Sequence, residues 1–223
     1  MNAARSPSLR RLTIGLGLIL GLSLATACAT RPPENPEEAA AAEAIRVLVD
    51  VAAIPGDFMA RQRLLGAMGE HRLAADVVLQ KQGDTLTLMG LTPFGTRAFA
   101  LIQDGREVSF QPFIDAPLPF PPELMLADIH RTLFLGIGAP AADGSRRLHL
   151  AGERVDERWA GGRLMERRFL RRRGKPKGLI AIDYGEGMRG SEPPPKVEIR
   201  NERFGYTVTI ETVTFQRLDT PRG

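Results

Sequence analysis

The sequence of 223 residues contains one cysteine, one tryptophan and three histidines. A single cysteine cannot form an intramolecular disulfide, and it excludes a zinc site built from several cysteines. His71, His130 and His149 are far apart and form none of the H-x-x-x-H or H-E patterns of metal-dependent enzymes. We therefore expect no metal and no cofactor. The apolar fraction of 43% and the charged fraction of 25% are those of an ordinary globular protein of one domain, or at most two.

Recognisable catalytic motifs are also missing. Ser109, Ser145 and Ser191 stand in no G-x-S-x-G context, and Gly185-Glu186-Gly187 lacks the downstream glycine of a nucleotide-binding loop. Carboxylates are plentiful but form no known paired motif. We expect that the protein is not an enzyme. The alternative is a catalytic triad whose residues come together only in the folded protein. The protein would then be a hydrolase or transferase that acts on a lipid-linked product.

The N-terminal segment has the pattern of an export signal. Residues 1–11 carry three arginines and no acid, and residues 12–25 form an uncharged apolar run. This run of 14 residues is shorter than the roughly 20 residues that span a bilayer. Ala25-Thr26-Ala27 precedes Cys28 in a way that resembles a bacterial lipobox, which predicts a signal peptide over residues 1–27 and lipidation of Cys28, for example with palmitate. The alternative is a plain signal peptide with an incidental Cys28.

Cleavage before Cys28 would remove three arginines and no acid, which leaves 27 basic against 26 acidic residues. The sequence pI of about 9.7 therefore belongs largely to the signal, and we expect no nucleic acid as a partner. Two acyl chains would anchor the protein stably to a membrane. Ala29 follows the cysteine where an aspartate would favour the inner membrane, so we expect the periplasmic face of the outer membrane of a Gram-negative bacterium. Residues 28–36 form a Pro-rich tether, and residues 37–223 a single domain.

Two helices are predicted in this domain. The first spans residues 37–53, with an apolar stripe and a stop at Pro55-Gly56; the stripe consists of Ile45, Leu48, Val49 and Ala52. The second spans residues 122–134, begins after two prolines, and places five residues near one face: Leu124, Met125, Asp128, Ile129 and Leu133.

The remaining pattern has period two. Residues 58–113 predict a meander of four or five antiparallel strands, with a hairpin turn at Asp104-Gly105. Residues 141–146 and 185–195 are expected to be loops. The apolar face of the last strand changes parity near Glu211, which indicates a β-bulge. The sum is about ten strands. We expect a mainly β fold with α, a curved antiparallel sheet that forms an incomplete barrel covered by a helical lid.

A basic run lies in the C-terminal half: Arg167, Arg168, Arg171, Arg172, Arg173, Lys175 and Lys177. It could contact anionic lipid headgroups or a partner lipoprotein. The favoured interpretation is a solvated hairpin whose charged edges resist aggregation.

Four segments carry a resemblance to the LolA/LolB superfamily, and specifically to LolB-like outer-membrane lipoproteins. They are residues 86–96 (LTLMGLTPFGT), 117–129 (PLPFPPELMLADI), 162–174, and 194–215 (PPKVEIRNERFGYTVTIETVTF). The G-L-T-P-F-G-T form is closer still to a bacterial lipoprotein family of unknown function, with some members in aryl-polyene-type gene clusters. The resemblance covers residues 41–215 and implies an eleven-stranded half-barrel, a helical lid and an apolar cavity for acyl chains. Phe94 matches a protruding leucine of LolB that delivers cargo into the membrane.

The resulting prediction is a monomeric, lipid-anchored protein that binds a lipid or acylated cargo for transport or membrane insertion. A periplasmic LolA-like carrier is an expected partner. The alternative is a ligand-free interaction module of an envelope assembly machine. Phe94 lies at a turn, where its ring either folds back onto the sheet or stands out to contact a membrane. The candidate cavity residues are Val77, Leu79, Leu86, Leu88, Phe99, Leu101, Ile129, Leu133, Ile180, Ile182 and Tyr184.

Overall fold

The computed structural model describes residues 35–115, 118, 121–138, 141–171, 173 and 176–218. The predicted signal peptide, Cys28 and nearly all of the predicted tether lie outside these residues. The chain divides into two compact units, Met1–Arg31 and Pro32–Gly223, and every described residue belongs to the second.

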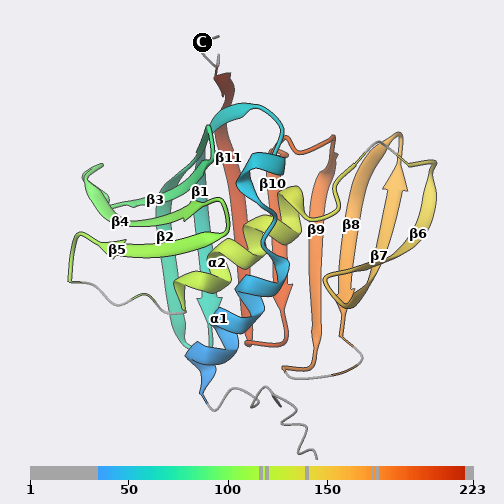
Figure 1. Cartoon of the computed structure of the whole chain (residues 1–223), viewed down its shortest axis with the longest axis horizontal. Helices are drawn as coiled ribbons and strands as arrows, with labels where there is room; N and C mark the ends of the chain where they lie inside the picture. Colours follow the sequence, from blue (N-terminus) through green and yellow to red (C-terminus); the bar gives the residue numbers. More distant parts are fainter. Residues whose placement is uncertain are drawn as a thin grey trace, which may run out of the picture. The chain divides into compact units, whose positions relative to one another are not determined.

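Eleven antiparallel strands form one sheet in the order β5-β4-β3-β2-β1-β11-β10-β9-β8-β7-β6. The first and last strands of the chain pair in its middle, and β5 and β6 are its two edges (Figure 1). The predicted open, curved sheet with two helices is confirmed. The strands are β1 (Asp57–Met68), β2 (His71–Gln82), β3 (Thr85–Leu91), β4 (Arg97–Asp104), β5 (Glu107–Pro112), β6 (Gly144–Leu150), β7 (Glu153–Ala160), β8 (Arg163–Leu170), β9 (Leu179–Met188), β10 (Lys196–Asn201) and β11 (Tyr206–Leu218).

The helices lie across the concave face of the sheet (Figure 1). They are α1 (Pro36–Val47), a short 3-10 turn η1 (Val51–Ala53), α2 (Pro122–Ile129) and a π-helical turn η2 (His130–Phe134) that continues α2. The side chain of Asn35 caps α1 by accepting a hydrogen bond from the backbone N–H of Glu38.

The prediction for the first helix was wrong in its length and its face. The backbone is already extended at Leu48, so α1 ends six residues earlier than residue 53. Ile45 is 66% exposed and Ala52 is exposed. The side chains that α1 buries are Ala40, Glu43, Ala44 and Val47. A glutamate on the inner face forms ion pairs there, which a search for apolar spacing cannot detect.

The predicted bulge in the last strand is confirmed. Arg61 of β1 pairs with Thr214 and the next residue, Gln62, pairs with Thr212, so Val213 is the extra residue on β11. The expected loops were too long, because β6 already begins at Gly144 and β9 continues to Met188. Residues 58–68 form a strand as expected.

The core fills the space between the concave face and α2-η2. Every residue from Leu124 to Phe134 is buried, so the helix is enclosed on all sides rather than on one face. Four of these buried residues are polar or charged: Asp128, His130, Arg131 and Thr132. A buried polar group is costly unless it is paired, so their partners define where the lid is held.

Candidate functional site

The predicted cavity residues are all buried in one continuous core between sheet and helices. Val77, Leu88 and Ile129 line an apolar cavity of about 30 Å³ between the sheet and α2. A cavity of this size can hold a water molecule or two, whereas sites for small-molecule ligands measure roughly 300–1,000 Å³. The lid is therefore closed in this structure, and an acyl chain could enter only if α2 were displaced.

Most residues that line the cavity were absent from the sequence-based set. Leu64 comes from β1, Ile199 from β10, and Tyr206, Val208 and Ile210 from β11. Alternation along these strands was visible in the sequence. What was not visible is that β1, β10 and β11 are adjacent in the middle of the sheet, directly beneath α2.

One carboxyl group stands in the wall of this apolar cavity. Asp128 of α2 accepts a hydrogen bond from the Tyr206 hydroxyl at 2.6 Å, and the Tyr206 oxygen in turn accepts one from the Asn201 amide at 2.8 Å. Burial raises the pKa of Asp128 to about 6, although Arg131 and Tyr206 act in the opposite direction. A carboxyl group with this pKa changes its charge around pH 6, at the point where the lid meets the cavity.

The fully buried His130 connects the lid by hydrogen bonds to the segment after α1 and to strand β4. Its Nδ1 accepts a hydrogen bond from the backbone N–H of Val49, so its Nε2 donates to Oε1 of Gln103 at 2.6 Å. Gln103 also donates to the carbonyl oxygens of Val49 and Gly105. Burial lowers the pKa of His130 to about 3, so the ring is neutral. With both nitrogens in use, His130 contacts no serine or acid.

The π-helical turn is capped by side chains from the sheet. Arg167 of β8 donates to the carbonyl oxygen of Arg131 at 2.7 Å, and Tyr184 of β9 donates to that of Thr132 at 2.9 Å. Arg167 also forms a fully buried ion pair with Glu157 at 3.0 Å. The expectation of a solvated basic hairpin was thus wrong for Arg167, because its side chain points inward and donates to one of the carbonyl oxygens at the π-turn.

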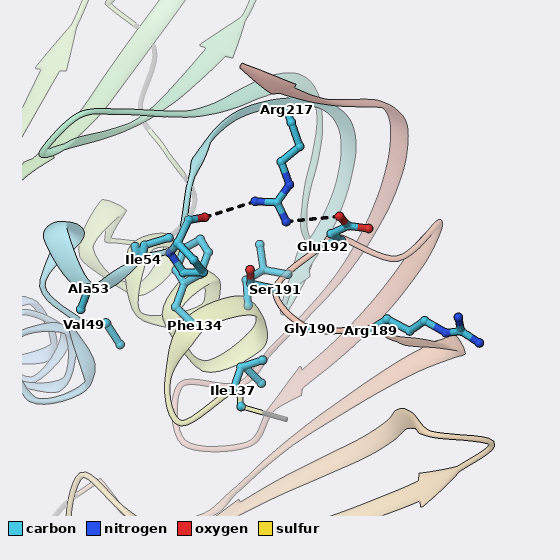
Figure 2. Close-up of a pocket in the computed structure, with 13 residues that line it drawn as sticks. Val49, Ala53, Ile54, Phe134, Ile137, Arg189, Gly190, Ser191, Glu192 and Arg217 are labelled. Carbon is cyan, nitrogen blue, oxygen red and sulfur yellow. Dashed lines mark hydrogen bonds and ion pairs between the residues drawn. The ribbon is translucent and has the colours of Figure 1, made fainter. Parts of the chain in front are cut away.

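A cleft of about 520 Å³ opens at one end of the lid (Figure 2). Its walls come from the connection between α1 and β1, from the end of η2, and from the β9–β10 loop; they include Val49, Ile54, Phe134, Ile137, Ser191 and Glu192. On the rim, Arg217 donates to the carbonyl oxygen of Pro55 and to Glu192, both at 3.2 Å. Arg189 is directed away from the cleft. Ile54 and Phe134 contribute little accessible surface to this wall because they are almost completely buried in the core.

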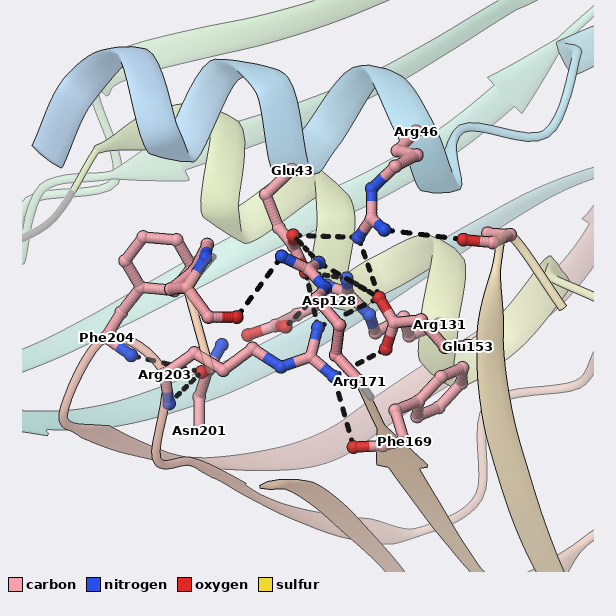
Figure 3. Close-up of polar contacts among 12 residues, drawn as sticks. Glu43, Arg46, Asp128, Arg131, Glu153, Phe169, Arg171, Asn201, Arg203 and Phe204 are labelled. Carbon is pink, nitrogen blue, oxygen red and sulfur yellow. Dashed lines mark hydrogen bonds and ion pairs between the residues drawn. The ribbon is translucent and has the colours of Figure 1, made fainter. Parts of the chain in front are cut away.

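A buried ion-pair cluster fastens the other part of the lid to the sheet (Figure 3). Two carboxylates, Glu43 of α1 and Glu153 of β7, face four guanidinium groups. Arg203, in the turn between β10 and β11, contacts both carboxylates, with Nη1–Oε1 distances of 2.8 Å to Glu43 and 2.9 Å to Glu153. Arg131 and Arg171 also pair with Glu43. Arg46 bridges the two carboxylates from the solvent side, at 2.9 Å and 2.7 Å.

Both carboxylates are ionised. Burial alone raises the pKa of Glu43, but Arg131, Arg171 and Arg203 outweigh it and hold that pKa below its usual range. Burial opposes ionisation of Glu153 too, yet its hydrogen bonds with Arg203 and the nearby Arg131 and Arg171 lower its pKa to about 2. The solvated-hairpin expectation was therefore wrong for Arg171 as well. Arg168, in contrast, is exposed as expected.

Phe94 stands out from the molecule. It lies in the Thr92–Gly95 turn between β3 and β4, which is closed by a hydrogen bond from the Gly95 N–H to the Thr92 carbonyl oxygen. Its side chain is 92% exposed, so it does not fold back onto the sheet. Its contact with a membrane remains a prediction.

The part of the chain that the structure describes contains neither a cluster of metal-ligating side chains nor a membrane-spanning helix. No group of three or more His, Cys, Asp or Glu residues lies close enough there to hold a metal ion. None of the described helices is long and apolar enough to cross a bilayer.

Fold and site together define a class of protein: an open antiparallel half-barrel whose apolar interior is closed by a two-helix lid, with buried polar contacts between lid and sheet. The chain belongs to the family DUF3261, described as a protein of unknown function, whose model matches residues 59–214. The predicted membership in a family of unknown function is confirmed. No curated protein matches the chain significantly.

Several solved structures are similar to the chain. A LolA superfamily protein from Nitrosomonas europaea is 14% identical, with a TM-score of 0.47, over 84% of this chain and 96% of that one. A putative outer membrane lipoprotein-sorting protein domain from Vibrio parahaemolyticus is 10% identical, with a TM-score of 0.40, over 82% and 93%. A DUF1329 family protein from Desulfovibrio piger is 11% identical, with a TM-score of 0.32, over 82% and 93%.

Proposed function

We propose that this protein is a lipid-anchored envelope protein that binds a lipid or an acylated cargo between its sheet and its lid, for transport or membrane insertion. One observation supports the proposal: the middle strands of the open sheet present apolar side chains to a small cavity beneath α2, and the lid is held over them partly by polar contacts. Displacing α2 would expose the apolar side chains of β1, β2, β3, β10 and β11 that line this cavity. Burial of an acyl chain there would contribute about 0.8 kcal/mol per CH₂ group, which compensates for the lost lid contacts.

The binding is proposed to be passive, without a chemical step. The lid is held by ion pairs and hydrogen bonds from side chains of the sheet, and such contacts can be exchanged for water when α1 and α2 move. Apolar cargo can then replace the apolar face of α2. The proposed site of action is the periplasmic face of the outer membrane, with a LolA-like carrier as the donor.

Native mass spectrometry tests this proposal. The unit Pro32–Gly223, which contains every described strand and helix, is purified from a Gram-negative periplasm. A retained phospholipid, fatty acid or acylated peptide at one per chain is the expected result. A ligand-free mass that stays unchanged after incubation with lipids and acylated peptides would contradict the proposal and favour the interaction module.

A matched pair of variants locates the site. Val77 is buried and lines the cavity, whereas its neighbour Val78 is only partly buried and, by strand alternation, points to the opposite face of β2. Val77→Phe should fill the cavity and reduce lipid retention, and Val78→Phe should leave retention unchanged. Overpacking costs roughly 1–3 kcal/mol, so thermal unfolding is measured for both variants to confirm that each is folded.

Phe94 is proposed to act in delivery rather than in cargo binding. Phe94→Asp should impair transfer of cargo into vesicles while folding and cargo retention stay normal, because the ring makes almost no contact with the domain. Transfer at the unaltered rate would refute the role of this residue, and loss of folding would contradict its exposed position.

A further inference from the structure

Phe94 is not the only exposed apolar side chain in this part of the molecule, because the neighbouring edge strand β5 carries others. Val108, Phe110, Phe113 and Ile114 form half of the eight large apolar residues that are exposed among those described. All four lie within seven residues on the edge strand β5 and the segment that follows it. Exposed apolar residues that are scattered singly need no explanation, but a cluster of them marks an interaction surface.

The end of β5 lies at the same side of the sheet as the Phe94 turn. Arg97 is the first residue of β4, three positions after Phe94, and its guanidinium carbon lies 4.6 Å from the centre of the Phe113 ring. The backbone N–H of Phe113 donates to the carbonyl oxygen of Ala98 at 2.9 Å. Figure 1 shows the β3–β4 turn and the end of β5 together on the left. We call the group Phe94, Phe113 and Ile114 the apolar corner.

We propose that the apolar corner is a bilayer-contact surface, in which Phe113 and Ile114 enter the membrane interface beside Phe94. Contact through residues of two different segments would restrict the orientation of the domain at the membrane, which a single inserted ring cannot do. The inference deepens the proposed function and rests on its membrane anchor.

The short segment between Cys28 and the domain is the reason to expect a bilayer, rather than another protein, at the apolar corner. Asn35, the first described residue, follows Cys28 by seven positions, a reach of at most about 25 Å for an extended chain. An acylated Cys28 would therefore keep the domain at the membrane surface at all times. Aromatic side chains at the polar–apolar boundary are typical of membrane interfaces. The charges next to the corner, Arg97 and Asp115, cancel, so insertion needs no anionic lipid.

The test uses the full chain, processed by a Gram-negative host and reconstituted into vesicles of phosphatidylethanolamine and phosphatidylglycerol. Cysteine replaces Phe94, Phe113 or Ile114 in separate variants, and each thiol is labelled with the polarity-sensitive fluorophore NBD. Matched controls carry the label at Ile45 and Val213, which are exposed apolar residues on α1 and at the bulge of β11. The unaltered chain, treated in parallel, reports any labelling of Cys28.

Quenching by lipids with a doxyl group on the acyl chain is the readout. We expect loss of most NBD emission at positions 94, 113 and 114, and none at positions 45 and 213. Quenching should persist at about 0.5 M salt, where exposed charges are largely screened. Its disappearance there would overturn the proposal in favour of binding through exposed arginines such as Arg168.

The remaining outcomes separate this inference from the proposed function. Quenching at position 94 alone would overturn the role of Phe113 and Ile114 but leave the delivery role of Phe94 intact. No quenching at any position would refute both. Equal quenching at position 45 or 213 would mean that the domain has no fixed orientation, which also overturns the inference. Cargo retention in the mass-spectrometric test is unaffected by any of these results.

Discussion

Replacement of Glu43 by glutamine should release the lid. The Glu43 carboxylate is 2% exposed and pairs with Arg46, Arg131, Arg171 and Arg203. Glutamine keeps the shape but removes the charge, which leaves four guanidinium groups around a single carboxylate. Removal of one partner from a buried ion pair costs about 3–5 kcal/mol, a large part of the roughly 5–15 kcal/mol that stabilises a domain. We expect a loss of this size.

Urea unfolding of Pro32–Gly223 at neutral pH measures the effect. Glu38→Gln is the matched control: Glu38 is an exposed glutamate in the first turn of the same helix, and glutamine can keep its hydrogen bond from Asn35, so only the helix-dipole contribution of about 0.3–1 kcal/mol is lost. Hydrogen exchange then locates the change. Amides of α1 should exchange faster in Glu43→Gln, while those of the central strands β1 and β11 should change less. A loss below about 1 kcal/mol would refute the conclusion that this cluster fastens the lid.

Two further predictions concern the core. The pKa of His130 is about 3 in the folded protein and 6.5 in the unfolded chain, so below pH 6.5 the unfolded chain binds one more proton at this residue. The free energy of unfolding therefore falls by up to about 1.4 kcal/mol for each pH unit below 6.5. Asp128, whose pKa is raised to about 6, opposes this fall. The urea midpoint of His130→Gln should therefore depend less on pH, and an equally steep dependence would contradict the assignment. A Cβ atom on Gly90 would lie 2.1 Å from the Phe99 ring, whereas one on Gly138 would meet nothing within 4 Å. Gly90→Ala should cost about 1–3 kcal/mol in thermal unfolding and Gly138→Ala much less, and equal losses would refute the close packing.

Local patterns predicted the sheet well because the physics of a strand is local. Alternation of apolar and polar residues decides which face of a strand is buried, and a change in that alternation near Glu211 was enough to predict the bulge at Val213. The turn at Asp104-Gly105 joins β4 and β5 as expected, since glycine adopts the positive φ that the turn requires. The second helix was predicted from its two leading prolines and its apolar spacing.

The contacts that hold the lid could not be predicted in the same way. Glu43 and Arg203 are 160 positions apart in the chain, and neither belongs to a motif. Arg167 and Arg171 were part of a basic run that looked solvated, yet strand direction and the position of the helices turn them inward. Whether a charged residue is buried depends on a partner from a distant element, because burial without one is prohibitively costly.

For this protein, the sequence by itself determined the strands, the bulge, the covering helix and the turn that carries Phe94. These follow from short-range periodicity and from residues with restricted backbone geometry. Only the tertiary structure decided that the cavity beneath the lid has a volume of only about 30 Å³, that buried polar contacts hold the lid, and that Phe113 packs against Arg97 close to the turn that carries Phe94. Each of these depends on which distant segments pack together, and packing is set by the whole fold rather than by neighbours in the chain.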